Sequence, residues 1–181
     1  MLLKNKTLVK IVTMFGVAVS LLGIGSVTAS ASSKPYYGSF GSRKITYHID
    51  STSKHWKDNW NGAIKSWNSL HVVKLRSAKK ASKANIRLTT KKSIKDGAEI
   101  SGHLSGPQGI GGVLSSKVVL NRQVLSEFDE NGKEQIALTG VGTALGLKFN
   151  HTDNTSAMSM FASKPNAQDK KNLQLAYKGI K

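Results

Sequence analysis

The chain has 181 residues, 39% of them hydrophobic, and no cysteine. These values exclude a disulfide-stapled module and a chain too polar to fold, and they fit one ordinary domain. Its 27 lysine and arginine residues outnumber the 10 acidic ones, giving a net charge of +17. Such a charge predicts attraction to polyanions such as wall polymers, anionic lipid surfaces or nucleic acid.

Residues 1–31 have the pattern of a signal peptide. Lys4, Lys6 and Lys10 precede an apolar stretch, which ends in the small residues Ala29-Ser30-Ala31. A transmembrane anchor is the competing interpretation, but polar residues and glycines interrupt the run and no basic cluster follows it. We expect cleavage after Ala31, which leaves a secreted chain of 150 residues with a net charge of +14 and no transmembrane anchor.

The rest of the chain predicts a single domain over residues 43–181, preceded by a flexible leader rich in Ser, Gly and Tyr at residues 32–42. Residues 43–50 alternate in hydrophobicity as a strand does. Residues 53–69 place three tryptophans at helical spacing, which favours a helix face packed on a sheet over a ligand platform.

Further strands are predicted at residues 72–75 and 85–90, and the glycine-rich residues 97–112 predict a loop with one short edge strand near 110–114. The next strand is expected at residues 117–125, followed by an Asp-Glu-Asn-Gly turn within 128–133. Helical spacing then predicts helices at residues 134–147 and 166–180.

The lysines of the central segment have no aromatic residues interleaved with them, so they do not predict a base-stacking platform or a specific nucleic-acid partner. A solvated basic surface is the simpler interpretation, and a partner in the cell envelope is the second. These lysines are Lys74, Lys79, Lys80, Lys83, Lys91, Lys92 and Lys95.

Residues 139–151, TGVGTALGLKFNH, and residues 153–158, DNTSAM, resemble the metzincin zinc metalloproteases, in particular small secreted bacterial matrixin-like peptidases. The family motif is H-E-x-x-H-x-x-G-x-x-H followed by a methionine turn. Gly146 sets the register, and Met158 takes the place of the turn methionine. RKITYHID, KVVLN and PNAQDKKNLQLAY are similar to the first strand, the strand before the active-site helix and the terminal helix.

The resemblance implies a metzincin-like α/β (α+β) fold, in which a twisted mixed β-sheet packs with an active-site-type helix and a C-terminal helix. The chemical positions of the motif nevertheless depart from it. Thr139, Thr143 and Phe149 stand at the three metal-ligand positions, and Gly140 stands at the general-base position. Threonine hydroxyls are poor zinc ligands, phenylalanine has no donor atom, and glycine accepts no proton.

Other chemistry is weakly indicated. His151 is a weak candidate metal ligand, two residues beyond the third ligand position, and the remaining histidines are dispersed: His48, His55, His71 and His103. A nucleotide-binding glycine loop at Gly140, Gly142 and Gly146 lacks the acidic residue that would end a second strand. No G-x-S-x-G nucleophile elbow is present. Gly140 also lacks a packing reason within a predicted helix.

The sequence therefore predicts a monomeric, non-catalytic pseudoprotease without a cofactor, which is secreted and either released or associated with the cell wall. Its expected partner is an extended peptide or an anionic cell-wall polymer. By resemblance, the candidate peptide groove comprises Gly109, Ile110, Gly111, Gly112 and Val113. The alternative is an active zinc-dependent metalloendopeptidase that uses a non-standard metal site.

Overall fold

A computed structural model describes residues 34–51, 53–95, 98–104 and 112–181, with the backbone alone for residues 99–104. The expected signal peptide and the groove residues Gly109, Ile110 and Gly111 lie outside the described residues. Among the described helices, none combines the length and the apolar character needed to cross a membrane.

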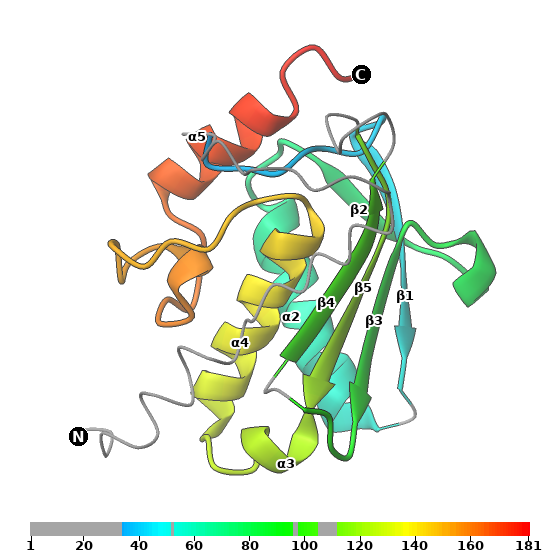
Figure 1. Cartoon of the computed structure of the whole chain (residues 1–181), viewed down its shortest axis with the longest axis vertical. Helices are drawn as coiled ribbons and strands as arrows, with labels where there is room; N and C mark the ends of the chain where they lie inside the picture. The colour runs from blue at the N-terminus through cyan, green and yellow to red at the C-terminus, as the bar shows by residue number, and fades with distance from the viewer. Residues whose placement is uncertain (1–33, 52, 96–97, 105–111) are drawn as a thin grey trace, which may run out of the picture.

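Five strands form one mixed sheet in the order β2-β1-β3-β5-β4 (Figure 1). The neighbouring pairs among β1, β2, β3 and β5 are parallel, and β4 lies antiparallel to β5 at the edge. Their bounds are Lys44–Asp50 for β1, Lys74–Ser77 for β2, Ile86–Lys91 for β3, Ala98–Leu104 for β4 and Val113–Asn121 for β5. This is the mixed α/β sheet that the strand patterns predicted.

Two long helices, α2 (Lys54–Asn68) and α4 (Glu130–Ala144), pack against each other beside the sheet (Figure 1). Trp56, Trp60 and Trp67 of α2 are buried, as their helical spacing predicted. The indole Nε1 of Trp67 donates a hydrogen bond to the carbonyl oxygen of Leu138 at 2.9 Å. The tryptophan face therefore fixes the position of α4, which carries Thr139, Gly140 and Thr143 of the sequence motif.

Shorter elements complete the domain: η1 (Ala81–Lys83), α3 (Arg122–Leu125), η3 (Ala157–Ser159) and α5 (Ala167–Ala176). The helix α5 begins with a capping box, in which the Asn166 side chain accepts from the backbone of Asp169 and the Asp169 side chain accepts from the backbone of Asn166. Arg43, just before β1, donates to the carbonyl oxygens of Tyr177 and Ile180 at 2.9 and 2.7 Å. These bonds tie the C-terminal tail to the first strand.

The region after β3 differs from the sequence prediction. Residues 98–104, expected as loop, form strand β4, because the next strand, β5, pairs with it in antiparallel fashion along its length. The strands predicted at 110–114 and 117–125 are one strand, β5. It ends at Asn121, whose side-chain oxygen accepts from the backbone N–H groups of Gln123 and Val124 and so begins α3.

The predicted turn at residues 128–133 is also wrong in its second half. Asp129 accepts a hydrogen bond from the backbone N–H of Gly132 at 2.8 Å, and the helix α4 begins at Glu130. An N-cap aspartate followed by an acidic first turn stabilises a helix start, so the Asp-Glu-Asn-Gly sequence opens a helix here. The helix ends at Ala144, earlier than the predicted residue 147, because Gly146 adopts a left-handed conformation with φ of +99°.

The segment expected as a flexible leader makes specific contacts over its described part, residues 34–42. The Tyr37 backbone N–H donates to Gly146 O at 2.7 Å, and the Lys148 N–H donates to Pro35 O at 3.0 Å. Phe40 is 3% exposed and forms a parallel bridge with Val113. These contacts place the leader against both the end of the zinc-motif segment and the start of β5.

Candidate functional site

Thr139, at the first ligand position, lies on the face of α4 that contacts η3. Its side chain is fully buried. The hydroxyl donates to the carbonyl oxygen of Ala157 at 2.7 Å, and the carbonyl oxygen of Gln135 lies 3.1 Å away on the same helix. Ala157 is the first residue of η3, which contains Met158. The hydroxyl therefore ties the helix to the turn beneath it.

Thr143 and Phe149, at the other two ligand positions, are likewise engaged with protein groups. The Thr143 hydroxyl donates to the carbonyl oxygen of Thr139, one turn back on α4, at 3.0 Å. The Phe149 ring meets the imidazole of His151 edge-on, with ring centroids 4.3 Å apart. His151 is exposed, and its ring packs against the side chain that replaces the third ligand.

The glycines of the motif allow close packing. A Cβ atom at Gly140 would lie 3.1 Å from Val118 Cγ1 on β5 and 3.8 Å from the Trp60 ring, so this position faces the sheet and α2. No reason for a glycine at this position was apparent from the sequence, and the crowding by Val118 and Trp60 supplies one. At Gly142, a Cβ atom would overlap the Met158 sulfur and the Trp67 ring. The helix α4 thus approaches its neighbours at positions where only glycine fits without displacing them.

The methionine turn is held by Asp169 of α5. The Asp169 carboxylate accepts from the Ser156 hydroxyl at 2.5 Å and from the Ala157 N–H at 2.8 Å, and the aspartate is 1% exposed. Met158 is 2% exposed beneath α4. The sequence resemblance placed Ser156 and Met158 in the turn and Asp169 in the terminal helix, but it predicted no contact between Ser156 and Asp169. The N-x-x-D pattern at 166–169 is the sequence signal that marks this anchor.

An exposed loop precedes the turn. The Thr155 hydroxyl and backbone N–H donate to the Asp153 carboxylate at 2.6 and 2.9 Å. These bonds, with further ones from Asn166 and the Ser156 backbone, lower the pKa of Asp153 below its ordinary value. The carboxylate is thereby used in loop structure, and it accepts from the side-chain amide of Asn166 at 3.1 Å.

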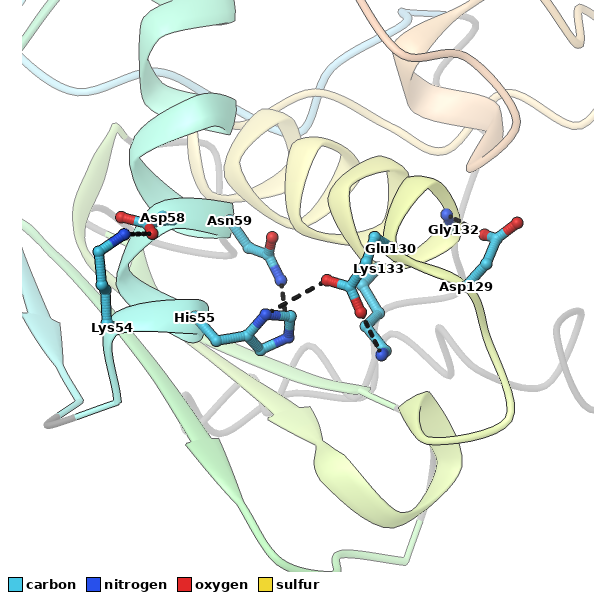
Figure 2. A network of polar contacts seen from close by, with 8 residues as sticks. All are labelled: Lys54, His55, Asp58, Asn59, Asp129, Glu130, Gly132 and Lys133. Atoms are coloured by element: carbon cyan, nitrogen blue, oxygen red, sulfur yellow. Dashed lines mark hydrogen bonds and ion pairs between the residues drawn. The ribbon is translucent and has the colours of Figure 1, made fainter.

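His55, in the first turn of α2, is paired with the carboxylate of Glu130 at the start of α4. Its Nδ1 lies 3.2 Å from Glu130 Oε2, and Lys133 Nζ lies 2.7 Å from the other oxygen of Glu130. Figure 2 shows these side chains meeting between the first turns of α2 and α4. The hydrogen bond from Lys133 is the main cause that lowers the pKa of Glu130. The cluster joins the two helices at the surface.

The remaining histidines lie on separate elements. His48 on β1 places Nδ1 2.9 Å from the carbonyl oxygen of Ala78, and His71 is exposed in the connection after α2. His103 lies on β4 opposite Ser115. Within residues 34–51, 53–95, 98–104 and 112–181, no group of three or more His, Cys, Asp and Glu side chains is arranged to hold a metal ion.

The described residues at the motif do not fit the zinc ion that the fold type implies. The Thr139 hydroxyl proton is already directed at a protein carbonyl, the Thr143 hydroxyl at another, and Phe149 offers no donor atom. Zinc sites in proteins use imidazole nitrogen, thiolate or carboxylate ligands. The side chains at the three predicted ligand positions therefore make contacts within the protein: Thr139 with Ala157, Thr143 with Thr139, and Phe149 with His151.

Two other surfaces were candidates for ligand binding. Of the predicted groove, Gly112 and Val113 are described, and the Val113 N–H donates to Ser39 O at 2.7 Å while Leu104 pairs with Val113 on its other side. Both edges of Val113 are thus paired within the chain.

A shallow pocket of about 690 Å³ lies at the carboxyl ends of β1 and β3, lined by His48, Ile49, Asp50, Ser51, Ser53, Trp56, Thr90 and Arg122. It contains none of the motif residues.

Comparison with known proteins adds a structural neighbour. No protein-family model matches the chain, and no curated protein matches it. Among solved structures, the structure of Myroilysin superposes with a TM-score of 0.50 and 11% sequence identity. The match covers 78% of this chain and 82% of that chain. At this identity the likeness concerns the fold alone, and it supports a metalloprotease-like arrangement of sheet and helices.

Proposed function

We propose that this chain is an exported, non-catalytic member of the metzincin-like group, which binds a partner at or outside the cell envelope. The observation that carries the proposal is the hydrogen bond from Thr139 to Ala157, at the position where the motif requires its first histidine. A buried hydroxyl that joins the helix to the methionine turn has a structural role. The accompanying Thr143, Phe149 and Gly140 leave no metal ligand and no general base at the family positions.

The export part of the proposal rests on residues 1–31. The binding part rests on two features: the net charge of +14 on residues 32–181, and family positions that lack the catalytic groups. Of the two expected partners, the anionic wall polymer has more support than an extended peptide, because the described end of the peptide groove is already paired on both edges at Val113. A peptide in that place would have to displace Ser39 and Phe40.

The first test is the zinc content of residues 32–181 after incubation with trace zinc and dialysis. We expect much less than one zinc per chain, a thermal transition unchanged by a chelator, and no cleavage of a mixed peptide library. About one zinc per chain with chelator-sensitive peptidase activity would overturn the proposal. That result would support the alternative of an active metalloendopeptidase.

A designed variant tests whether the scaffold corresponds to a zinc site. In Thr139→His/Thr143→His/Phe149→His, the three ligand positions of the motif are restored, and we expect about one zinc per chain. The variant Thr143→His/Phe149→His keeps the Thr139 tie and serves as the folding control. If the triple variant folds cooperatively and binds no zinc, the register of the motif on Gly146 is wrong.

A further inference from the structure

The face of the sheet opposite α2 and α4 carries a concentration of positive charge. Alternate residues of β1, β2 and β3 are buried toward the helices, as Ile45, Leu75 and Leu88 show. The residues between them point to the other face. We define the basic face by eight side chains on that side of the sheet and on the β2–β3 connection: Lys44, Lys74, Arg76, Lys79, Lys80, Lys83, Arg87 and Lys117.

The β2–β3 connection adds three lysines because it crosses over β1 on this side. The side chains of Thr46 and His48 bond to the carbonyl oxygens of Lys83 and Ala78, at 3.1 and 2.9 Å. Both side chains belong to the outward residues of β1. In Figure 1 the connection projects beside β1, on the side away from α4. Lys79, Lys80 and Lys83 are all exposed there.

Acidic residues do little to neutralise this surface. The sequence has ten lysines and arginines but no Asp or Glu from residue 59 to residue 95. Asp50 lies on the same face and is engaged by Arg87, at 2.5 Å, and by His48, at 3.4 Å. Within the described part of the chain, Lys44, Lys74, Lys79, Lys80 and Lys83 form no ion pair.

The arrangement also brings like charges together. Lys44 and Lys74 are direct neighbours in the parallel β1–β2 pair, and Arg87 and Lys117 are neighbours in the β3–β5 pair. Strands lie about 4.8 Å apart, and like charges directly opposite each other destabilise a sheet. A bound polyanion would relieve this repulsion. The fold itself does not require these like charges to lie side by side.

We infer that the basic face binds a linear phosphodiester polymer of the cell wall, such as a polyol phosphate. Lysine predominates over arginine in the face, and lysine acts as a flexible point charge without fixed bidentate geometry. That chemistry suits a mobile chain with one negative charge per repeat. Single-stranded nucleic acid is less well matched, because it is held by aromatic side chains on which bases stack. Among the residues whose side chains are described, the exposed large apolar ones lie elsewhere, at Tyr37, Leu114, Phe161 and Leu175.

This inference rests on the proposed export of the chain, and its test uses residues 32–181, which include every described element. The probe is purified poly(glycerol phosphate), titrated at several NaCl concentrations. We expect binding that weakens steeply with salt, because neutralised phosphates release counterions. The variant Lys79→Gln/Lys80→Gln/Lys83→Gln should bind about tenfold more weakly at low salt and show a smaller salt slope.

The matched control is Lys170→Gln/Lys171→Gln/Lys178→Gln, which removes the same charge from exposed positions on and just after α5. We expect its affinity to change less than about twofold. Equal losses in both triple variants would overturn the inference, because net charge alone would then explain the binding. Absence of binding at low salt, or tighter binding to single-stranded DNA of equal charge, would also overturn it. Zinc content measured on the same preparation tests the proposed function separately.

Discussion

Thr139 stands where the sequence resemblance implies the first metal ligand, and its hydroxyl makes a contact within the protein instead. Its hydroxyl is buried and bonded to Ala157 O, so Thr139→Val should lower the free energy of unfolding by about 1–3 kcal/mol. Thr143→Val, at a half-buried position, should cost less than about 1 kcal/mol. Urea denaturation of both variants measures the difference. Equal costs would show that the tie to the methionine turn contributes nothing beyond the lost hydroxyl.

The glycines of the two long helices give a second comparison at the scale of single residues. Gly142→Ala should destabilise the protein by about 1–3 kcal/mol, because the new methyl group overlaps Met158 and Trp67. Gly62→Ala in α2 has open space around it and should stabilise the protein by about 1 kcal/mol. Thermal melts of the two variants should therefore shift in opposite directions. A stabilising Gly142→Ala would contradict the packing of α4 described here.

Elements were predicted from the sequence where local signals and tertiary contacts agree. The helical spacing of the tryptophans correctly predicted α2, and the N-x-x-D pattern marks the start of α5. Strand β4 was missed because its glycine-containing sequence forms a strand only with β5 beside it. The start of α4 was misplaced because Asp129 can begin either a turn or a helix. Internal contacts of Thr139 and Gly140 were not predictable, since they depend on which elements meet α4.

The contacts of residues 34–42 with the rest of the domain should contribute to its stability, and deletion of these residues tests this. A chain beginning at Gly41 loses Phe40, which is 3% exposed, together with the hydrogen bonds to Gly146 and Lys148. We expect its free energy of unfolding to fall by about 3 kcal/mol or more. A chain beginning at Lys34 keeps all these contacts and should match residues 32–181 in urea denaturation. If the shorter chain were equally stable, the leader contacts would contribute nothing.

On the scale of the whole molecule, Tyr177 links stability to alkaline pH. Its hydroxyl donates to Leu145 O at 3.1 Å and lies 3.4 Å from the Phe40 N–H, and burial raises its pKa above the ordinary 10.0. The folded state favours the neutral phenol. Its contribution to stability is therefore complete below about pH 10 and is lost as the pH rises toward the folded-state pKa.

Melting temperatures measured from pH 8 to pH 11.5 test this link. The melting temperature should fall above about pH 10. In Tyr177→Phe, the melting temperature should fall less over the same pH range. The variant should be less stable by about 1 kcal/mol at neutral pH, because two hydrogen bonds are lost. Tyr37 and Tyr47, whose pKa values burial also raises, supply a smaller background of the same sign. An equal fall in melting temperature in the variant would assign the alkaline loss of stability to Tyr37 and Tyr47.

Arg43 joins the first strand to the last residues of the chain, across sequence separations of 134 and 137 residues. Contacts so distant form late in folding, because the entropy of closing a long loop must be offset first. A chain threaded through a translocation channel with its N-terminus leading has not yet delivered residues 177–180 to Arg43. Under the proposed export, these two Arg43 hydrogen bonds would therefore form only after residues 177–180 have crossed the membrane.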